Sequence, residues 1–496
     1  MRRLHRSVRT LSLLALIGIA PVWATNGMNM EGYGPIASGM GGASLAYENG
    51  TAALMNNPAT LALIAPGQRR LDLAFGRLGP EVFANVSTPL GVLKAKSHGD
   101  SYVMPAIGFI TKGERITYGA GIFAQGGMGT EFSRTSWLSD PSQGANTALA
   151  QGLHNRSEVS VGRFLVPVAY DVNENLRIGV TGDLVWAGLD LQLAMSQAQF
   201  VDLATTQNGG SVGGSLAQVF GALYEPFGGT GIRQLHHAYF DFSDDSSMTG
   251  EAKGTGFGAK IGAVYSITPE LQVGATYHTK TAISDLESDD ATMEIAVNVD
   301  TGLLQTGVPS GQYADLAIPV SGKITIVDFQ WPATMGIGLA YQATPRLFVA
   351  ADVRQIQWSG VMEDFSMVFD AAGSAENGGF ASQSLEATLF QHWDDQNVIS
   401  LGAAFEATQD LIVRAGINQA SNPVPDTYLN ALFPAIVESH VSLGATYGVG
   451  NGNSINLSLV RGLEGKGTNP GNGLTVPAVT STHAQWNLQV MYSHWL

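Results

Sequence analysis

The chain has 496 residues, with 25 lysine and arginine residues against 41 aspartate and glutamate residues, and it contains no cysteine. The missing cysteines exclude disulfide frameworks, thiolate zinc sites and cysteine nucleophiles. The formal net charge of −16 argues against nucleic acid or anionic lipid headgroups as partners.

The N-terminus has the three parts of a secretory signal peptide. Arginines in the first nine residues precede an apolar run from Leu11 to Ile19, and a small-residue cleavage site ends at Ala24. We therefore expect residues 1–24 to be a signal peptide and the mature chain to begin at Thr25. An uncleaved anchor helix would need about 18 or more apolar residues, and this run ends at Pro21. No later stretch is long and apolar enough for a transmembrane helix, so any spanning must be done by strands.

Residues 25–66 are rich in glycine and other small residues and carry no strand pattern. A wide barrel has a lumen that its own side chains cannot fill, so we expect this segment to be an N-terminal hatch, a plug inside the lumen. The alternative is a disordered leader to the first strand. That alternative would leave Met40, Leu45, Leu54 and Met55 in water.

From residue 67 to residue 496, strand-like segments of transmembrane length are joined alternately by tight polar turns and by long loops. This alternation is typical of an outer-membrane barrel, with turns in the periplasm and loops outside. We expect an all-β, antiparallel transmembrane β-barrel of about 14 strands. The expected turns are at 111–114, 173–175, 268–270, 344–346, 409–410 and 450–453, and the long loops begin near Gly79, Gln125, Met195, Ser284, Ser359, Ser421 and Glu464.

Period-two alternation predicts which face of each strand meets lipid. The last strand is the clearest case, with one apolar and one polar face. We expect an outer face containing Ile116, Tyr118, Ile122, Phe257, Ile261, Tyr265, Ile399, Leu401, Trp486, Leu488, Val490 and Tyr492. A soluble β-sandwich would also alternate, but its turns would not alternate short with long.

The loop from Ser196 to Met248 contains a short amphipathic helix. Leu216, Val219, Phe220 and Leu223 have the i, i+3, i+4, i+7 spacing of one helix face. This stripe either packs on the loop from 284 to 330 or forms a groove open to a hydrophobic ligand.

Four cations have lumen parity and could hold a ligand head group: Arg177, Lys260, Lys280 and Arg414. The alternative is ordinary ion pairing, because Asp183, Asp352 and Glu406 also face inward by the same parity.

Several motifs in order resemble the FadL family of outer-membrane transporters for long-chain fatty acids and other hydrophobic compounds. They are residues 39–46 with Asn57-Pro58-Ala59, Gly129-Thr130-Glu131-Phe132, residues 332–338 with 357–359, and residues 414–417 with 421–426. The resemblance runs from residue 39 to the final strand.

The resemblance implies a barrel closed by a hatch, with one strand kinked inward to leave a lateral opening in the wall. The kink would be residues 125–129, with Gly126, Gly127 and Gly129 as gate residues, because glycine tolerates the bulged backbone. The alternative is an ordinary flexible loop start. Asn57 and Pro58 match family residues that pack against the kink, and Phe132 is a candidate ligand contact.

The resemblance also implies passive uptake of a fatty acid or hydrocarbon by lateral diffusion, with outer-membrane lipid around a monomeric barrel. The segment Trp393-Asp394-Asp395-Gln396 lacks the basic character of fatty-acid transporters, which favours a neutral hydrocarbon ligand. The chain ends in Trp495-Leu496 rather than in a terminal aromatic residue, which weakens the usual assembly signal.

The remaining function classes are an outer-membrane lipid hydrolase and a general diffusion porin. The Gly209-Gly210-Ser211-Val212-Gly213 match to a nucleophile elbow has no strand before it, so we expect no enzyme. We expect no cofactor and no metal site, since no zinc-binding or phosphate-loop motif is present. A porin would need an open polar lumen without a hatch.

Overall fold

The computed structural model describes residues 26–139, 152–246, 249–473 and 475–496. The expected signal peptide lies outside the described residues. Within the described ranges the chain is all-β, and its strands join in one sheet of 22 strands. No helix in these ranges is long and apolar enough to cross a membrane.

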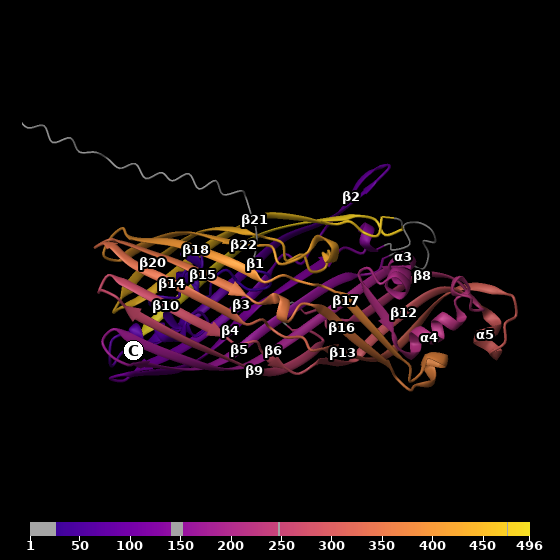
Figure 1. Ribbon diagram of the computed structural model, residues 1–496, viewed down its shortest axis with the longest axis horizontal. Coiled ribbons are helices and arrows are strands. Elements are labelled where there is room, and N and C mark those ends of the chain that lie inside the picture. The colour runs from indigo at the N-terminus through magenta and orange to yellow at the C-terminus, as the bar shows by residue number, and fades with distance from the viewer. Residues whose placement is uncertain (1–25, 140–151, 247–248, 474) are drawn as a thin grey trace, which may run out of the picture.

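Antiparallel pairing forms one closed circuit, because the last strand pairs with the first along almost its whole length (Figure 1). In order around this wall the strands are β1 (Arg69–Thr88), β3 (Tyr102–Lys112), β4 (Ile116–Phe132), β5 (Asn155–Asp171), β6 (Leu176–Ser196), β9 (Ala252–Ser266), β10 (Leu271–His278), β14 (Thr334–Thr344), β15 (Leu347–Ile356), β18 (Gln396–Glu406), β19 (Leu411–Ala420), β20 (Ser439–Gly450), β21 (Asn453–Asn469) and β22 (Val479–Trp495).

The long loops are not irregular, and this corrects the sequence-based expectation. They add strands that extend the sheet from β6 through β8, β12, β13, β16 and β17 to β7. The sheet is therefore larger than the about fourteen strands expected. The added strands are β2 (Gly91–Lys96), β7 (Gly210–Gly213), β8 (Ile232–Phe242), β11 (Ala282–Ile283), β12 (Leu286–Asp300), β13 (Tyr313–Val327), β16 (Asp364–Ala371) and β17 (Ser384–Phe390).

Short helices gather at the loop-bearing end, opposite the end where the chain stops at residue 496 (Figure 1). They are α3 (Gln197–Val201), η4 (Asp202–Thr206), α4 (Gly214–Leu223), η5 (Glu225–Phe227) and α5 (Thr301–Thr306), and four further single turns are η3 (Trp137–Ser139), η6 (Trp358–Gly360), η7 (Ala375–Phe380) and η8 (Asp426–Tyr428).

The expected tight turns are confirmed. Strand pairs β3–β4, β5–β6, β9–β10, β14–β15, β18–β19 and β20–β21 are each joined by two to four residues at the expected positions. Strands β1, β4 and β21 run past the expected loop starts at Gly79, Gln125 and Glu464, because they keep pairing beyond the level where the apolar alternation stops.

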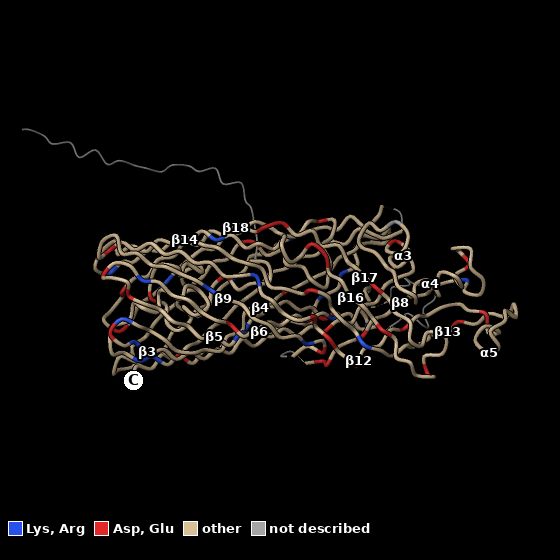
Figure 2. Tube along the Cα trace, turned by 60° about the horizontal axis from the view of Figure 1, so that its bottom comes forward, with Lys and Arg blue, Asp and Glu red and all other residues tan. Residues whose placement is uncertain are grey.

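The expected apolar outer face is also confirmed. The large side chains on that parity are exposed on the outside of the wall, among them Tyr118, Phe257, Leu401 and Trp486, while Asn487 and Gln489 on the opposite parity are buried. An exposed apolar belt around a closed sheet is the arrangement of a membrane barrel, whereas a sandwich would bury this face. Figure 2 shows that acidic residues recur among the loop-side strands β8 and β12.

Residues 26–66 are almost entirely buried and form α1 (Pro35–Gly39), η1 (Gly50–Leu54) and η2 (Pro58–Leu63). Helix α1 contacts β19–β22, η1 contacts β1 and β3, and η2 contacts β5, β6 and β9, so the segment touches the wall from opposite sides. Inward carboxylates hold its backbone: Asp352 accepts from the amides of Ser44 and Leu45 at 2.7 and 3.2 Å, and Asp72 accepts from the amide of Thr51 at 2.7 Å.

Candidate functional site: a pocket in the barrel wall

The wall is interrupted between β3 and β4. Their ladder runs from Lys112↔Thr117 to Ala106↔Phe123 and stops there, although both strands continue. Pro105 is the next residue of β3, and a proline cannot donate a hydrogen bond to a neighbouring strand. Beyond this point β3 still pairs with β1 and β4 with β5, but β3 and β4 no longer pair with each other, so one edge of β4 is left without its wall neighbour.

Residues 28 and 29 of the N-terminal segment occupy that free edge of β4. Asn29 forms a β-bridge with Gly126, and the amide of Gly127 donates to the carbonyl oxygen of Met28 at 3.1 Å. The β4–β5 register shifts between Ala124 and Gly126, the bulge that the glycine-rich sequence predicts. A Cβ atom on Gly126 would overlap the carbonyl oxygen of Met28, so the close approach requires glycine here.

A network of side chains fixes this contact. Asn29 Oδ1 accepts from Gln125 Nε2 at 3.0 Å and from Trp331 Nε1 at 2.8 Å, and Tyr33 Oη donates to the Gln125 carbonyl at 2.7 Å. Gln125 Oε1 also accepts from Arg163 of β5. The kink is therefore bound to the N-terminal segment on one side and to the wall on the other.

A pocket of about 260 Å³ lies at the interruption. One part of its lining comes from the interior, including Met28, Glu31 and Asn487. Another part comes from side chains of the outer face, including Ile122 and Trp186, which are 45% and 41% exposed. We call this the wall pocket. Its lining joins the barrel interior to the surface that faces lipid.

Glu31 is the buried carboxyl group of the wall pocket. It is 1% exposed, and its Oε2 accepts from Asn487 Nδ2 at 3.1 Å. Burial disfavours the charged carboxylate and raises the pKa of Glu31 to about 7. The segment that contacts the kink therefore carries a group that titrates near neutrality.

A second cavity of about 210 Å³ lies at the loop-bearing end, which we call the outer pocket. Its lining combines apolar side chains with amides, such as Leu193, Phe390, Leu432, Asn155 and Asn469. Among the described residues, no lysine, arginine, aspartate or glutamate lines it. A cavity of this composition suits a neutral apolar ligand.

Asn57 and Pro58 do not lie against the kink, which corrects the expected contact. Asn57 Nδ2 donates to the carbonyls of Leu45 at 2.7 Å and Ala263 at 3.3 Å, and its Oδ1 caps η2 by accepting from the Ala59 amide. Pro58 approaches Gly179 of β6. These residues anchor the N-terminal segment on β6 and β9, and residues 28 and 29 make the contact with β4.

The other gate and apolar candidates separate into two groups. Gly126, Gly127 and Gly129 line the wall pocket. The helix expected around Leu216 is confirmed as α4, but Leu216 and Phe220 are buried, and Phe220 packs on Phe200 and Tyr224 at ring-centre distances of 5.4 and 5.1 Å. The same hydrophobic core contains the fully buried Phe132, and Val219 and Leu223 pack against it. None of the five apolar candidates lines the wall pocket or the outer pocket: Phe132, Leu216, Val219, Phe220 and Leu223.

None of the four cation candidates lines either pocket. Lys260 is buried in an ion pair with Asp183, Arg177 lies 3.2 Å from Asp171, and Arg414 donates to Thr446 at 2.7 Å. Lys280 is exposed. The ion-pair alternative therefore holds for Lys260 and Arg177.

Four residues of the kink contact or the wall-pocket lining were not predicted from the sequence: Met28, Asn29, Glu31 and Glu158. The signal available was the run Asn26-Gly27-Met28-Asn29-Met30-Glu31, where two amides and a carboxylate stand close together, and nothing in the sequence marked Glu158. Within the described ranges, no group of three or more histidine or carboxylate side chains could hold a metal ion.

A closed antiparallel barrel with an apolar belt and a pocket through its wall belongs to the class of outer-membrane channels. The comparison with family models agrees. The chain belongs to the family described as "Outer membrane protein transport protein (OMPP1/FadL/TodX)", whose model matches residues 12–467.

Two solved structures show the same architecture. The toluene transporter TodX of Pseudomonas putida is 28% identical, with a TM-score of 0.74, and the alignment covers 93% of this chain and 98% of that one. The toluene transporter TbuX of Ralstonia pickettii is 27% identical, with a TM-score of 0.70, covering 93% and 98% of the two chains. An uncharacterized Chlorobium limicola protein, from the phosphoenolpyruvate carboxykinase gene 5′ region, is 46% identical over 72 residues; these make up 14% of this chain and 36% of that relative.

Proposed function

We propose that the protein is a passive outer-membrane channel for neutral hydrophobic compounds, which leave the barrel sideways through the wall pocket. The observation that carries this proposal is the mixed lining of the wall pocket, which joins buried interior residues to residues of the outer face. No coupled energy source is required, because transfer of an apolar molecule from water into lipid is itself favourable.

In this proposal residues 1–24 are the signal peptide, residues 25–66 are the hatch and residues 67–496 are the barrel. The hatch blocks straight passage along the barrel axis, which supports a sideways route. A compound would first bind in the outer pocket, pass into the interior and then reach the wall pocket beside Met28 and Gly126. The protein would act as a monomer surrounded by lipid.

The substrate class follows from two observations. The outer pocket is lined by apolar side chains and amides, and TodX and TbuX are described as toluene transporters. An aromatic hydrocarbon such as toluene needs no charged partner in its binding site. The substrate we favour is therefore a small neutral hydrocarbon rather than a long-chain fatty acid.

The test fills the wall pocket with a large side chain. Ser160 of β5 lines the pocket, whereas Val166 of the same strand is exposed on the outer face outside it. We expect Ser160→Trp to lower uptake of labelled toluene by cells expressing the full chain about tenfold or more, because an occluded route abolishes most flux. Val166→Trp should leave uptake unchanged.

The two variants and the unmodified protein must be compared at equal amounts of folded barrel in the outer membrane. This amount is checked by the heat-dependent electrophoretic mobility of the outer-membrane fraction. Equal uptake by Ser160→Trp and the unmodified protein would show that the wall pocket is not the route. Toluene uptake no greater than that of cells lacking the protein would refute the channel function for this substrate.

A further inference from the structure

We propose that the wall pocket discriminates against ligands that carry a carboxylate, and that Glu31 and Glu158 are its specificity-determining residues. This inference rests on the function proposed above and adds the chemical rule that selects among hydrophobic compounds: a neutral end group passes and an anionic one is rejected.

The charges that line the wall pocket are the first line of evidence. Of the lysine, arginine, aspartate and glutamate residues that the structure describes, only Glu31 and Glu158 line it. Glu31 is contributed by the N-terminal segment and Glu158 by β5. A ligand at the kink therefore meets two carboxyl groups and no lysine or arginine that lines the pocket. The imidazole of His483 also lines it, and its Nδ1 donates to the carbonyl oxygen of Pro434 at 2.8 Å.

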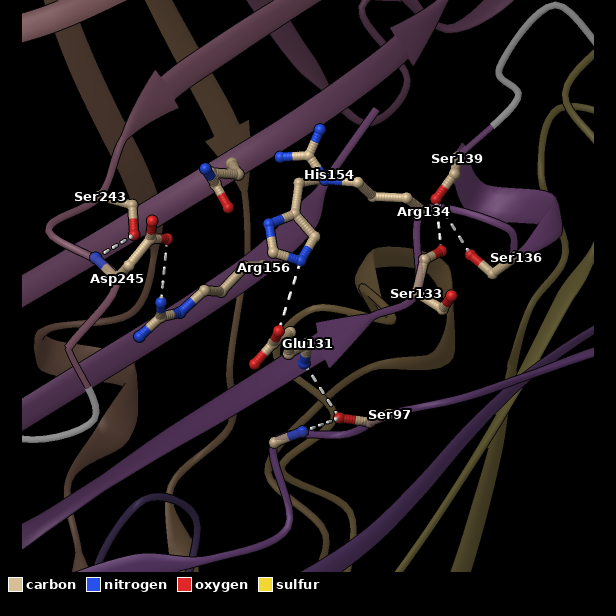
Figure 3. A network of polar contacts seen from close by, with 12 residues as sticks. Ser97, Glu131, Ser133, Arg134, Ser136, Ser139, His154, Arg156, Ser243 and Asp245 are labelled. Atoms are coloured by element: carbon tan, nitrogen blue, oxygen red, sulfur yellow. Dashed lines mark hydrogen bonds and ion pairs between the residues drawn. The ribbon is translucent and has the colours of Figure 1, made fainter. Parts of the chain in front are cut away.

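The ion pairs of Arg156, which include the one with Glu158, are the second line of evidence. Figure 3 shows the pair of Arg156 with Asp245 and the nearby pair of His154 with Glu131. Arg156, the cation closest to Glu158 in sequence, lies 3.1 Å from that carboxylate, 3.5 Å from Asp190 and 3.3 Å from Asp245. Three carboxylates thus share one guanidinium. Glu131 lies 3.4 Å from His154 in the same region, so the cluster beside the pocket carries an excess of acidic groups.

Two buried cations close to the kink, Arg163 and Lys260, are engaged with other partners. Arg163 donates to Asp183 at 2.8 Å and also to Gln125, and Lys260 pairs with the same Asp183. Neither side chain lines the wall pocket. A ligand carboxylate would have to displace one of these ion pairs to gain a cationic partner, because the other donors that line the pocket are neutral amides and hydroxyls.

These contacts set the selectivity physically. A carboxylate that enters a poorly hydrated pocket loses water and needs a cation or several donors in return. Here it would instead lie beside Glu158, and like charges brought together in an interior repel strongly. A ligand that carries a hydroxyl group in place of the carboxylate can donate a hydrogen bond to a glutamate oxygen. A hydrocarbon has no polar group that needs a hydrogen-bond partner.

The experiment compares two probes that share one carbon skeleton, 4-phenylbutan-1-ol and 4-phenylbutanoate, with toluene as the reference compound. Uptake is measured at about pH 8, where a free carboxylic acid is ionised. We expect cells expressing the full chain to take up the alcohol about tenfold or more faster than the acid, after subtraction of uptake by cells that lack the protein.

Replacing the carboxylates should change that ratio. We expect Glu158→Gln, alone and combined with Glu31→Gln, to raise the acid-to-alcohol uptake ratio about tenfold, because the amide keeps the shape and removes the repulsion. Arg156 retains Asp190 and Asp245 as partners in both variants. The control is Glu386→Gln, an exposed carboxylate on β17 outside both pockets, which should keep the original ratio.

The outcomes separate this inference from the proposed function. Toluene uptake with equal rates for acid and alcohol would overturn the inference and leave the channel standing. A ratio that stays unchanged in folded Glu158→Gln and in the double variant would overturn the role of the two glutamates. Failure of all three compounds to enter would overturn the proposed function, and the inference with it.

Discussion

At the residue scale, Glu31 is the side chain whose protonation matters most for the N-terminal segment. Its carboxyl group is buried beside the kink contact, with Asn487 as its side-chain donor from the wall. Burial raises its pKa from 4.5 to about 7, because the interior penalises the charged form more than water does. If the segment moved and exposed Glu31 to water, the pKa would return towards 4.5.

This difference predicts a pH-dependent docking of the segment. The docked state holds its proton up to about pH 7 and the released state only up to about pH 4.5, so docking weakens as the pH rises between these values. The total loss is roughly 3 kcal/mol. We expect amide hydrogen exchange of residues 26–34, corrected for intrinsic rates, to be faster at about pH 8 than at about pH 5.

Glu31→Gln should remove the pH dependence of that exchange, because the amide does not titrate in this range. Amides of β14 and β15 in the wall serve as the internal reference. A pH dependence that survives in Glu31→Gln would mean that another group controls docking.

At the element scale, the kinked strand β4 depends on a backbone exchange of partners. Pro105 ends the pairing with β3, and Met28 and Asn29 of the N-terminal segment then pair with Gly126 and Gly127. Strand β4 thus lacks part of its ladder with β3 and pairs with the N-terminal segment instead. Because β4 and the N-terminal segment share these hydrogen bonds, a substitution in one should change the stability of the other.

Gly126→Ala tests this coupling. The added Cβ would overlap the Met28 carbonyl, and relieving such overpacking typically costs about 1–3 kcal/mol. We expect faster amide exchange at Gly127 and in residues 26–30. The matched control is Gly182→Ala on β6, where a Cβ would meet nothing within 4 Å and exchange should not change. Unchanged exchange in Gly126→Ala would show that the bridge does not hold the segment.

At the scale of the whole molecule, the apolar belt and the closed circuit together require a lipid environment. Large apolar side chains on the outer face are exposed all around the wall, and the wall strands pair in a closed circuit whose ladder is shortened between β3 and β4. In water this belt would drive aggregation, whereas in a bilayer it is the solvated surface.

A charge on the belt should therefore be costly. Leu443 lies midway along β20 and is 63% exposed, and we expect Leu443→Arg to lower the free energy of unfolding in vesicles by about 2–4 kcal/mol. Leu90, at the tip of the β1–β2 hairpin that leans away from the wall (Figure 1), is fully exposed, so Leu90→Arg should have little effect. The measurement is urea unfolding followed by tryptophan fluorescence. Equal effects of the two substitutions would argue against a lipid-facing belt at Leu443.

The local parts of the fold could be read from the chain because they depend on neighbouring residues. Turn chemistry around Pro345 and Asn451 predicted the short connections, and alternation from Trp486 to Tyr492 predicted the outer face. The strands inside the loops were not predicted, because a β-bulge between Ser288 and Ala291 shifts the alternation of β12 in mid-strand.

The candidate site was only partly predictable for the same reason. The cluster of glycines at 126, 127 and 129 indicated an unusual backbone, but the contact that requires glycine at position 126, the carbonyl oxygen of Met28, came only from the structure. The contact expected for Asn57 was wrong, because its partners, Leu45 and Ala263, are selected by how the segment docks inside the wall. The ligand-binding role expected for Lys260 and Arg177 found no support either, as both cations pair with carboxylates brought in by neighbouring strands.

The sequence by itself determined the strand periodicity, the turn positions and the lipid-facing parity, because each depends on the chemistry of a few successive residues. Only the tertiary structure decided that residues 28 and 29 replace β3 at the kink, that three carboxylates share Arg156, and that Glu31 and Glu158 are the charged residues of the wall pocket. Those features arise where segments from different parts of the chain meet, and the closure of the barrel fixes which residues face one another.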